Sequence, residues 1–510
     1  MARVFIISNR VAVPTRVRSV HAGGLEVALR ATLKRHDCVW MGWSGEVKPK
    51  GQTETQTINA RGVTYIVTDL SEEDYDEYYN GFANRVLWPI LHYRLDLAEF
   101  TRRELSGYLR VNEHFADELD KVLKPDDIIW VHDYHLMPLA KALRDRGRKN
   151  RIGFFLHIPM PPPDILTAMP QHDKLIGALL HYDLVGFQTD ADTQNFARYL
   201  ASECGMPSHI PRISVDGRTM RVGAFPVGIE TKEFNRRARG AARSSFVRKV
   251  RDSVPGSLIM GVDRLDYTKG ITLRLDAFER FLVANPKWRG QVTYLQITPK
   301  SRSDIQEYAE MEREIDTSAG RINGNYGDVS WTPIRYVNRS YTRTALAGLY
   351  RSARVGLVTP LRDGMNLVAK EYVAAQDPAD PGVLILSRFI GAAAEFGAAL
   401  IVNPYDPEAV AAAIARALDM PRDERIERHQ KLFAALLEND IKYWGDRFLA
   451  ALTGKNGNLN VASSAFAPAS LSALAPALER PAAPLSLGSQ PALTNPPGVA
   501  ARVIEPTPRI

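Results

Sequence analysis

The sequence predicts an α/β protein made of two Rossmann-like, doubly wound lobes that face each other across a cleft. Two observations predict this fold class. Short apolar runs alternate with amphipathic stretches, and this pattern occurs twice along the chain, separated by a charged stretch at 232–251. The length of 510 residues also exceeds what one ordinary core can fill, so two domains are expected.

The first half contains four short apolar runs typical of buried parallel strands, each followed by polar or Gly residues. They lie at 4–7, 128–131, 152–156 and 184–187. Between them, residues 136–144 and 192–201 have apolar side chains three and four apart, as in amphipathic helices. Buried strands need helices on both faces of their sheet, which indicates a doubly wound lobe over residues 1–235.

The second half repeats this organisation over residues 236–440. Its predicted strands lie at 258–262, 292–297, 355–358 and 383–386, and its clearest helix at 272–284. The stretch 232–251 is predicted as a helix and linker. From about 456 to 510, Ala, Pro and Ser dominate without periodicity, so we expect a disordered tail.

Composition excludes several classes of protein. The 65 basic and 58 acidic residues are scattered without a basic block, which argues against nucleic acid and favours small anionic substrates. Pro468 and Pro476 interrupt the one long uncharged run, so no membrane helix is expected. Cys38 and Cys204 are too few for a disulfide framework, and the first residues lack a secretory pattern. We therefore expect a cytoplasmic protein.

Ligands of parallel sheets bind beyond the carboxyl ends of the strands, so the residues that follow each strand are the candidates for chemistry. Ser8-Asn9-Arg10 follows the first strand, and Gly23-Gly24 precedes a predicted helix. Paired glycines there let backbone N–H groups approach a phosphate or a sugar. A simple turn explains the same pair equally well.

Polar side chains also follow the next two strands, as His132-Asp133-Tyr134-His135 and as His157. Asp133 and His157 are predicted to bind sugar hydroxyls. A metal site is the less favoured alternative, because these loops offer no pair of histidines four residues apart and few spare carboxylates.

The second lobe places Arg264 and Lys269 on the loop after its first strand, ahead of a helix that begins near Gly270. An Arg fork and a Lys point charge in that place are suited to gripping a diphosphate from two sides. The alternative is a loop held by surface salt bridges.

Asp363, Gly364 and Glu371 follow the strand at 355–358. The glycine allows a tight turn with N–H groups aimed at a ligand, and Glu371, on the helix that follows, is placed to accept two ribose hydroxyls. A capped helix with an exposed Glu is the structural alternative.

Together these residues resemble glycosyltransferase family 20, the retaining glucosyltransferases that make trehalose 6-phosphate and have the GT-B fold. The resemblance extends from about residue 3 to about 450. Its motifs are Ser8-Asn9-Arg10, 22–25, 76–80, 86–89, 92–94, the two histidine motifs, 264–270 and 359–376.

The resemblance implies a role for each matching residue. Arg10, Tyr79, Asp133 and Arg302 would hold glucose 6-phosphate, with Arg10 and Arg302 on its phosphate. Trp40 and Trp88 would line the acceptor pocket, although either fits a core. Asp363 and His157 would contact the transferred glucose. The implied UDP-glucose site comprises Gly23, Gly24, Arg264, Lys269, Tyr341, Asp363, Leu367, Val368, Ala369, Lys370 and Glu371.

The resemblance further implies the reaction. Glucose would pass from UDP-glucose to glucose 6-phosphate with retention, which gives α,α-trehalose 6-phosphate and UDP and serves osmoprotection. Arg264 and Lys269 would neutralise the departing UDP, so no metal or other cofactor is expected. The family also implies a homotetramer with small-molecule substrates, and a helix at 441–455 that returns to the first lobe.

Two other functions remain open from the sequence. A catalytically silent sensor of sugar phosphates would keep the fold, but it has no need of the donor-binding residues Arg264, Lys269, Asp363 and Glu371. A phosphorylase or a glycogen-type synthase shares two lobes, but Arg10 with Arg302 favours a small phosphorylated acceptor over a polymer end.

Overall fold

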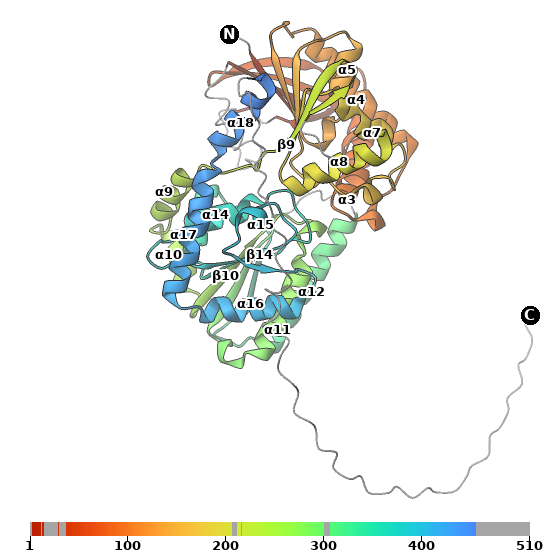
Figure 1. Ribbon diagram of the computed structural model, residues 1–510. Coiled ribbons are helices and arrows are strands. Elements are labelled where there is room, and N and C mark those ends of the chain that lie inside the picture. The colour runs from red at the N-terminus through yellow and green to blue at the C-terminus, as the bar shows by residue number, and fades with distance from the viewer. Residues whose placement is uncertain are drawn as a thin grey trace, which may run out of the picture. The chain divides into compact units, whose positions relative to one another are not determined.

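Two separate sheets form the centres of two lobes (Figure 1). The computed structural model describes residues 3–11, 13–14, 29, 37–206, 212–215, 217–299 and 306–454. Within these residues the first sheet has the strand order β3-β4-β2-β1-β5-β6-β7-β9-β8, and the second β12-β11-β10-β13-β14-β15. The pairs β3–β4 and β8–β9 are antiparallel, and the other pairs are parallel. The predicted pair of α/β lobes is therefore confirmed.

The strands of the first lobe are β1 (Val4–Arg10), β2 (Cys38–Lys48), β3 (Thr55–Ala60), β4 (Val63–Ser71), β5 (Ile128–His132), β6 (Arg151–Phe155), β7 (Leu184–Phe187), β8 (Arg212–Val215) and β9 (Arg218–Ala224). Its helices are α2 (Glu72–Asp74), η1 (Tyr75–Leu87), α3 (Trp88–Leu91), η2 (Leu95–Leu97), α4 (Arg102–Asp120), η3 (Tyr134–Leu136), α5 (Leu139–Asp145), α6 (Pro163–Leu166), α7 (His172–Ala178), η4 (Leu179–His181) and α8 (Asp190–Cys204).

The strands of the second lobe are β10 (Ser257–Val262), β11 (Val292–Ile297), β12 (Ile334–Val337), β13 (Val355–Val358), β14 (Val383–Ser387) and β15 (Leu400–Val402). The remaining helices are α9 (Thr231–Ala241), α10 (Ser245–Asp252), η5 (Tyr267–Lys269), α11 (Ile271–Ala284), η6 (Pro286–Trp288), α12 (Gln306–Tyr326), α13 (Arg343–Ser352), α14 (Leu367–Ala375), α15 (Ala392–Glu395), α16 (Pro407–Asp419), α17 (Arg422–Glu438) and α18 (Ile441–Thr453).

The predicted strands all occur, in β1, β5, β6 and β7 and in β10, β11, β13 and β14. The stretch 232–251 differs from the prediction: it forms two helices, α9 and α10, because the Ser244 side chain accepts a bond from the N–H of Val247 and caps a second helix. The helix predicted at 136–144 begins only at Leu139, after a short 3₁₀ turn.

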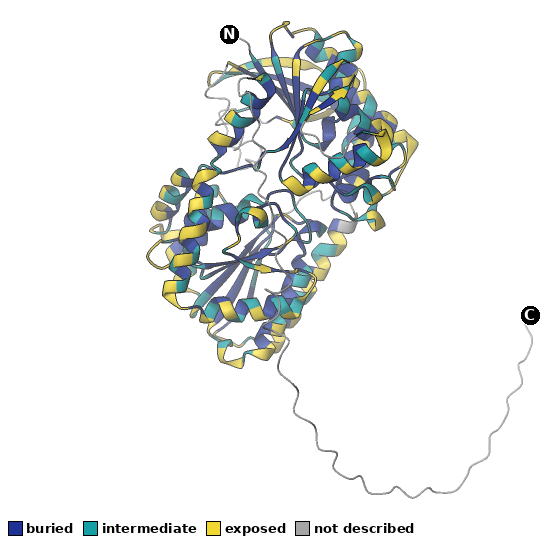
Figure 2. Cartoon of the chain, in the orientation of Figure 1, coloured by how far each residue is buried: buried dark blue, intermediate teal, exposed yellow. Residues whose placement is uncertain are grey.

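Both sheets are covered on two faces, and Figure 2 shows their strands largely buried beneath helices with exposed outer surfaces. Successive residues of β10 alternate between two cores. Ile259 packs with α11 and α16, whereas Leu258 and Met260 belong to the core that contains α13 and α14. This alternation is the period of two that a strand imposes on its side chains.

Helix α18 packs against β6 and β7 of the first sheet. Gly153 and Gly186 make room for it, since an added Cβ would lie 2.8 Å and 2.7 Å from the ring of Phe448. Helix α18 follows the second lobe in the sequence, and through it the chain returns to the first lobe. None of the helices in the described part of the chain combines the length and apolar character that a bilayer crossing requires.

Candidate active site

A cavity of about 710 Å³ lies between the lobes, at the carboxyl ends of β5, β6, β10 and β13. Residues from both lobes line it, and ten of the predicted site residues are among them: Trp88, Asp133, His157, Arg264, Lys269, Tyr341, Asp363, Leu367, Val368 and Glu371. Motifs that are far apart in the sequence therefore converge on one cavity, as the strand-end rule predicts.

Lys269 and Asp363, both in the cavity wall, form a buried ion pair. The Lys269 Nζ donates to Asp363 Oδ2 over 2.6 Å, and the two side chains are only 8% and 16% exposed. Asn366 Nδ2 and the N–H of Gly364 also donate to the carboxylate. Burial raises the pKa of Asp363, but Lys269 and the nearby His92 and Arg264 outweigh this and hold it below its usual range. Asp363 is therefore ionised at neutral pH.

Arg264 is exposed to the cavity and bridges the lobes. Its guanidinium carbon lies 5.9 Å from the ring of Trp88, which belongs to α3 of the first lobe. Lys269 keeps further N–H donors beside its bond to Asp363, because an ammonium has three. The two cations on this loop can thus face one anionic group together.

Asp133 and His157 form the opposite wall and are linked to each other. Asp133 Oδ1 accepts a bond from the backbone N–H of His157 over 3.3 Å. Asp133 has a φ of 73°, a conformation that non-glycine residues rarely adopt and that is common at functional sites. Its own N–H donates to the carbonyl of Phe155, which holds this unusual conformation in place.

His157 is a neutral side chain. Burial lowers its pKa to about 3, and its Nε2 lies 3.0 Å from Nδ1 of His132. His132 is fully buried, and burial together with the nearby His157 lowers its pKa well below the usual value. The two rings are uncharged and are linked by one hydrogen bond. His157 therefore presents a neutral hydrogen-bonding group to the cavity and not a positive charge.

Gly364 brings the second lobe into direct contact with this wall. A Cβ added at Gly364 would lie 1.9 Å from the backbone oxygen of His157. Only glycine allows this approach, so the predicted glycine turn serves a contact between lobes. The loops that carry Asp363 and His157 are fixed relative to each other by their backbones.

Glu371 lies in the cavity wall, paired with Arg343, whose Nε donates to Glu371 Oε1 over 3.0 Å. Burial raises the pKa of Glu371, and Arg343 offsets this only in part. Sequence reasoning missed Arg343, which follows Thr342, the capping residue of α13. An Arg at the first position of a helix that enters a cleft is the signal that was available.

The side chains of Lys370 and Ala369, two residues of the predicted donor site, do not line the cavity. The Lys370 side chain is fully buried, and its Nζ donates to the carbonyl of Val227 and to Glu395. Ala369 is buried, and its N–H donates to the side chain of Asn366, which caps α14. Both residues anchor the helix because they lie on its inward face, so their side chains do not reach the cavity.

Arg10 and Tyr79, two residues of the predicted acceptor site, meet at Trp43. The Arg10 guanidinium lies 5.4 Å from the Trp43 ring and the Tyr79 ring 5.5 Å from it. Tyr79 also stacks on His135, at 6.0 Å and 14°. Sequence reasoning missed Trp43, although it pairs with Arg10 across β1 and β2.

Trp40 lies in the core, the alternative that the sequence left open for it. It is 3% exposed, and its Nε1 donates to the hydroxyl of Ser8 within the core. Its position on the inward face of β2 explains why it does not line the cavity. Gly23, Gly24 and Arg302 lie outside the described residues. Among the residues that are described, no three His, Cys, Asp or Glu side chains come together as metal ligands.

The sequence profile of glycosyltransferase family 20 matches residues 7–454. The trehalose-6-phosphate synthase of Sinorhizobium fredii is 55% identical over 462 residues, which cover 89% of this chain and 99% of the relative. The enzyme of that name from Enterobacter sp. is 47% identical over 453 residues, or 89% and 95% of the two chains.

Two solved structures were determined with ligands. The UDP-forming α,α-trehalose-phosphate synthase of Burkholderia xenovorans, in complex with glucose-6-phosphate, is 47% identical and has a TM-score of 0.85 over 88% of this chain and all of that one. An E. coli relative bound with UDP-2-fluoro glucose is 46% identical, with a TM-score of 0.84 over 88% and 99%. The described lobes therefore have the GT-B fold of these enzymes.

Proposed function

Because the chain belongs to glycosyltransferase family 20, we propose that it transfers glucose from UDP-glucose to glucose 6-phosphate and releases α,α-trehalose 6-phosphate and UDP. The observation that carries this proposal is the cavity between the lobes, with Arg264 and Lys269 on one wall and Asp133 and His157 on the other. Relatives solved with glucose-6-phosphate and with UDP-2-fluoro glucose support the two substrates.

Arg264 and Lys269 face the diphosphate of the donor in this proposal. As the bond between glucose C1 and the β-phosphate oxygen breaks, negative charge grows on UDP, and the two cations stabilise it. Arg264 offers a planar fork and Lys269 an ammonium already oriented by Asp363. Because both positive charges are in place before the reaction, these side chains need not reorganise as UDP departs, and its departure is favoured.

The acceptor hydroxyl attacks C1 from the face that UDP leaves, so the anomeric configuration is retained. One C–O bond breaks and one forms, and the acceptor's proton passes to the β-phosphate oxygen of UDP. Lys269, Asn366 and the N–H of Gly364 all donate hydrogen bonds to the Asp363 carboxylate. We therefore assign Asp363 to binding of the transferred glucose and not to nucleophilic attack. Neutral His157 contributes a hydrogen bond to the transferred glucose.

We further propose which residues bind the acceptor, how the chain divides into domains, and where and in what oligomeric state the enzyme acts. Arg10, Tyr79 and Asp133, together with Arg302, hold glucose 6-phosphate. The lobe at 1–235 is the acceptor domain, the lobe at 236–440 the nucleotide-sugar domain, 441–455 returns to the first lobe, and 456–510 is a tail. The enzyme acts in the cytoplasm as a tetramer, without a metal ion.

A direct assay tests this function. Purified protein is mixed with UDP-glucose and glucose 6-phosphate, UDP release is followed with and without EDTA, and the product linkage is assigned by NMR. UDP release that requires both substrates and gives an α,α-1,1 linkage is expected. Binding of both without UDP release would instead identify a sensor, and transfer only to a glucan would identify a glycogen-type synthase.

A further inference from the structure

A buried carboxylate, Glu77, lies on the helix that carries Tyr79 and has no part in the reaction above. This helix, η1, is a π-helix of 13 residues, and the N–H of Trp88 at its end donates to the carbonyl of Ala83, five residues earlier. π-helices are rare and mostly limited to one turn, often at functional sites. Contacts outside η1 must therefore hold it in this conformation.

Two faces of η1 have different partners. Tyr75 and Tyr79, four residues apart, stack on each other at 5.6 Å, and each ring lies 5.5 Å from Trp43. Glu77 and Gly81, also four residues apart, face α4. The acceptor-side ring and the buried carboxylate thus belong to one rigid segment, on faces that contact different elements.

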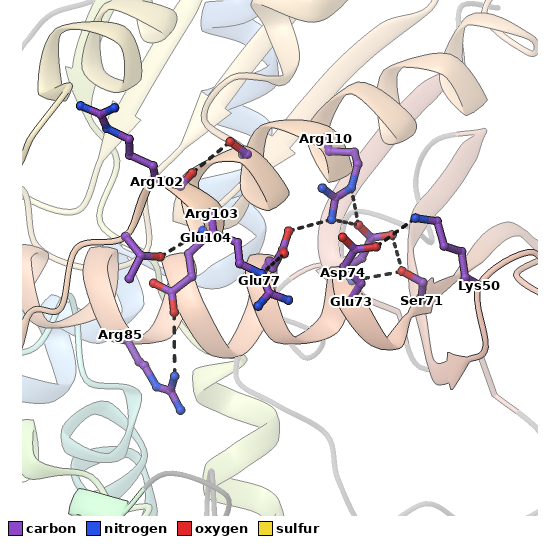
Figure 3. A network of polar contacts seen from close by, with 12 residues as sticks. Lys50, Ser71, Glu73, Asp74, Glu77, Arg85, Arg102, Arg103, Glu104 and Arg110 are labelled. Atoms are coloured by element: carbon purple, nitrogen blue, oxygen red, sulfur yellow. Dashed lines mark hydrogen bonds and ion pairs between the residues drawn. The ribbon is translucent and has the colours of Figure 1, made fainter.

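The Glu77 side chain is 5% exposed and bonds two arginines of α4 (Figure 3). Arg103 Nε donates to Oε1 over 2.5 Å, and Arg110 Nη2 donates to Oε2 over 2.9 Å. Arg110 also bonds Asp74, just before η1. Burial raises the pKa of Glu77, but the bonds from both arginines outweigh it and hold the pKa below its usual range. The carboxylate is therefore ionised at neutral pH.

Two glycines let η1 and α4 approach closely. A Cβ added at Gly107 of α4 would lie 2.3 Å from the Cβ of Glu77, and one at Gly81 of η1 would lie 2.6 Å from Cγ of Glu104. Glycine weakens a helix interior, so its presence at Gly107 indicates that the close approach matters more than helix propensity. Arg103 and Arg110, which bond Glu77, lie on either side of Gly107 in α4.

We propose that Glu77 is a positioning residue for the acceptor site. Its bonds to Arg103 and Arg110 hold η1 in the π-helical register that places the Tyr79 ring against Trp43 and His135. Without the carboxylate, η1 relaxes toward the more favourable α-helix and Tyr79 moves away from the acceptor. This inference rests on the proposed function, in which Tyr79 holds glucose 6-phosphate.

Glu77→Gln tests the proposal because it removes the charge and keeps the shape. We expect the KM for glucose 6-phosphate to rise about tenfold, the loss expected for about one hydrogen bond to a charged group. The KM for UDP-glucose should stay within about twofold. Glu73→Gln is the matched control, since Glu73 is an exposed carboxylate four residues earlier that bonds only Lys50 among the described ion pairs. It should change neither KM.

Two further variants approach the same interface differently. Gly107→Ala forces η1 and α4 apart without changing charge and should raise the KM for glucose 6-phosphate as Glu77→Gln does. Arg103→Gln removes one of the two bonds from a side chain that is 76% exposed, so the protein should fold and show a smaller rise. Thermal shifts give a readout apart from activity: the shift induced by glucose 6-phosphate should shrink, and that induced by UDP should persist.

The outcomes separate the two proposals. A wild-type protein that releases no UDP contradicts the proposed function. An active wild-type protein whose Glu77→Gln and Arg103→Gln variants raise both KM values equally, or lower only the Tm, overturns the positioning role of Glu77.

Discussion

The Nζ of Lys269 lies 2.6 Å from Oδ2 of Asp363, so the cation after β10 and the carboxylate after β13 form one unit. Lys269 and Asp363 are 94 positions apart in the sequence, so only the folded chain brings them together. The pair orients the ammonium toward the cavity and keeps the carboxylate ionised.

Lys269→Ala should lower kcat by about 100-fold or more, because a preoriented charge is lost where the leaving group develops its own. Steady-state rates of UDP release measure this. Lys287→Ala is the control, since Lys287 forms an exposed pair with Asp419 on the outer surface. An unchanged kcat in the Lys269→Ala variant would show that Lys269 serves structure only.

Gly364→Ala should prevent the contact between the Asp363 loop and His157, because the new methyl group would lie 1.9 Å from a backbone oxygen that cannot rotate away. We expect kcat to fall at least about tenfold, as misplacement of a site loop by about 1 Å does. Gly397→Ala is the control, because an added Cβ there meets nothing within 4 Å. Equal kinetics in both variants would contradict the close contact.

Arg343→Gln should weaken UDP-glucose binding, and increasingly so at lower pH. Burial raises the pKa of Glu371 and Arg343 lowers it, so removing Arg343 raises it further. As the pH falls, Glu371 in the variant becomes protonated at a higher pH than in wild type, so the KM for UDP-glucose rises earlier in the variant. Arg321→Gln, which breaks an exposed pair with Glu279, is the control. A KM ratio that is constant with pH would contradict the role of the carboxylate charge.

His92 should make the folded state less stable in mild acid. It is 3% exposed, and burial lowers its pKa to about 4, whereas the unfolded chain binds a proton near pH 6.5. Between these values the unfolded state holds more protons, so stability is lost as the pH falls through 6.5 toward 4. From pH 7 to pH 5 this amounts to about 2 kcal/mol.

Urea unfolding of wild type and of His92→Asn at both pH values measures this loss. Asn preserves a donor toward the carbonyl of Trp88, which the ring Nδ1 contacts at 2.8 Å, but does not titrate. The variant should lose less stability than wild type on acidification. Identical losses would assign the effect to other groups.

Short apolar runs predicted β1, β5, β10 and β13 because their residues are buried on both faces and need no alternation. β3 was not predicted, since its pattern TQTINA is polar and mostly exposed. The π-helix η1 was not predicted either, because no local sequence pattern specifies a π-helical register and its close contacts with α4 form only in the folded chain.

The sequence by itself determined the two lobes and ten of the residues that line the cavity, because strands and the residues that follow them are marked by local patterns. Tertiary structure decided which of those side chains face the cavity. Lys370 and Trp40 point into the core because they lie on the inward faces of their helix and strand. There the Lys370 side chain donates to Val227 and Glu395, and the Trp40 side chain donates to Ser8. Contacts between distant segments, which no local pattern encodes, placed Arg343 in the cavity wall beside Glu371 and placed Trp43 beside Arg10.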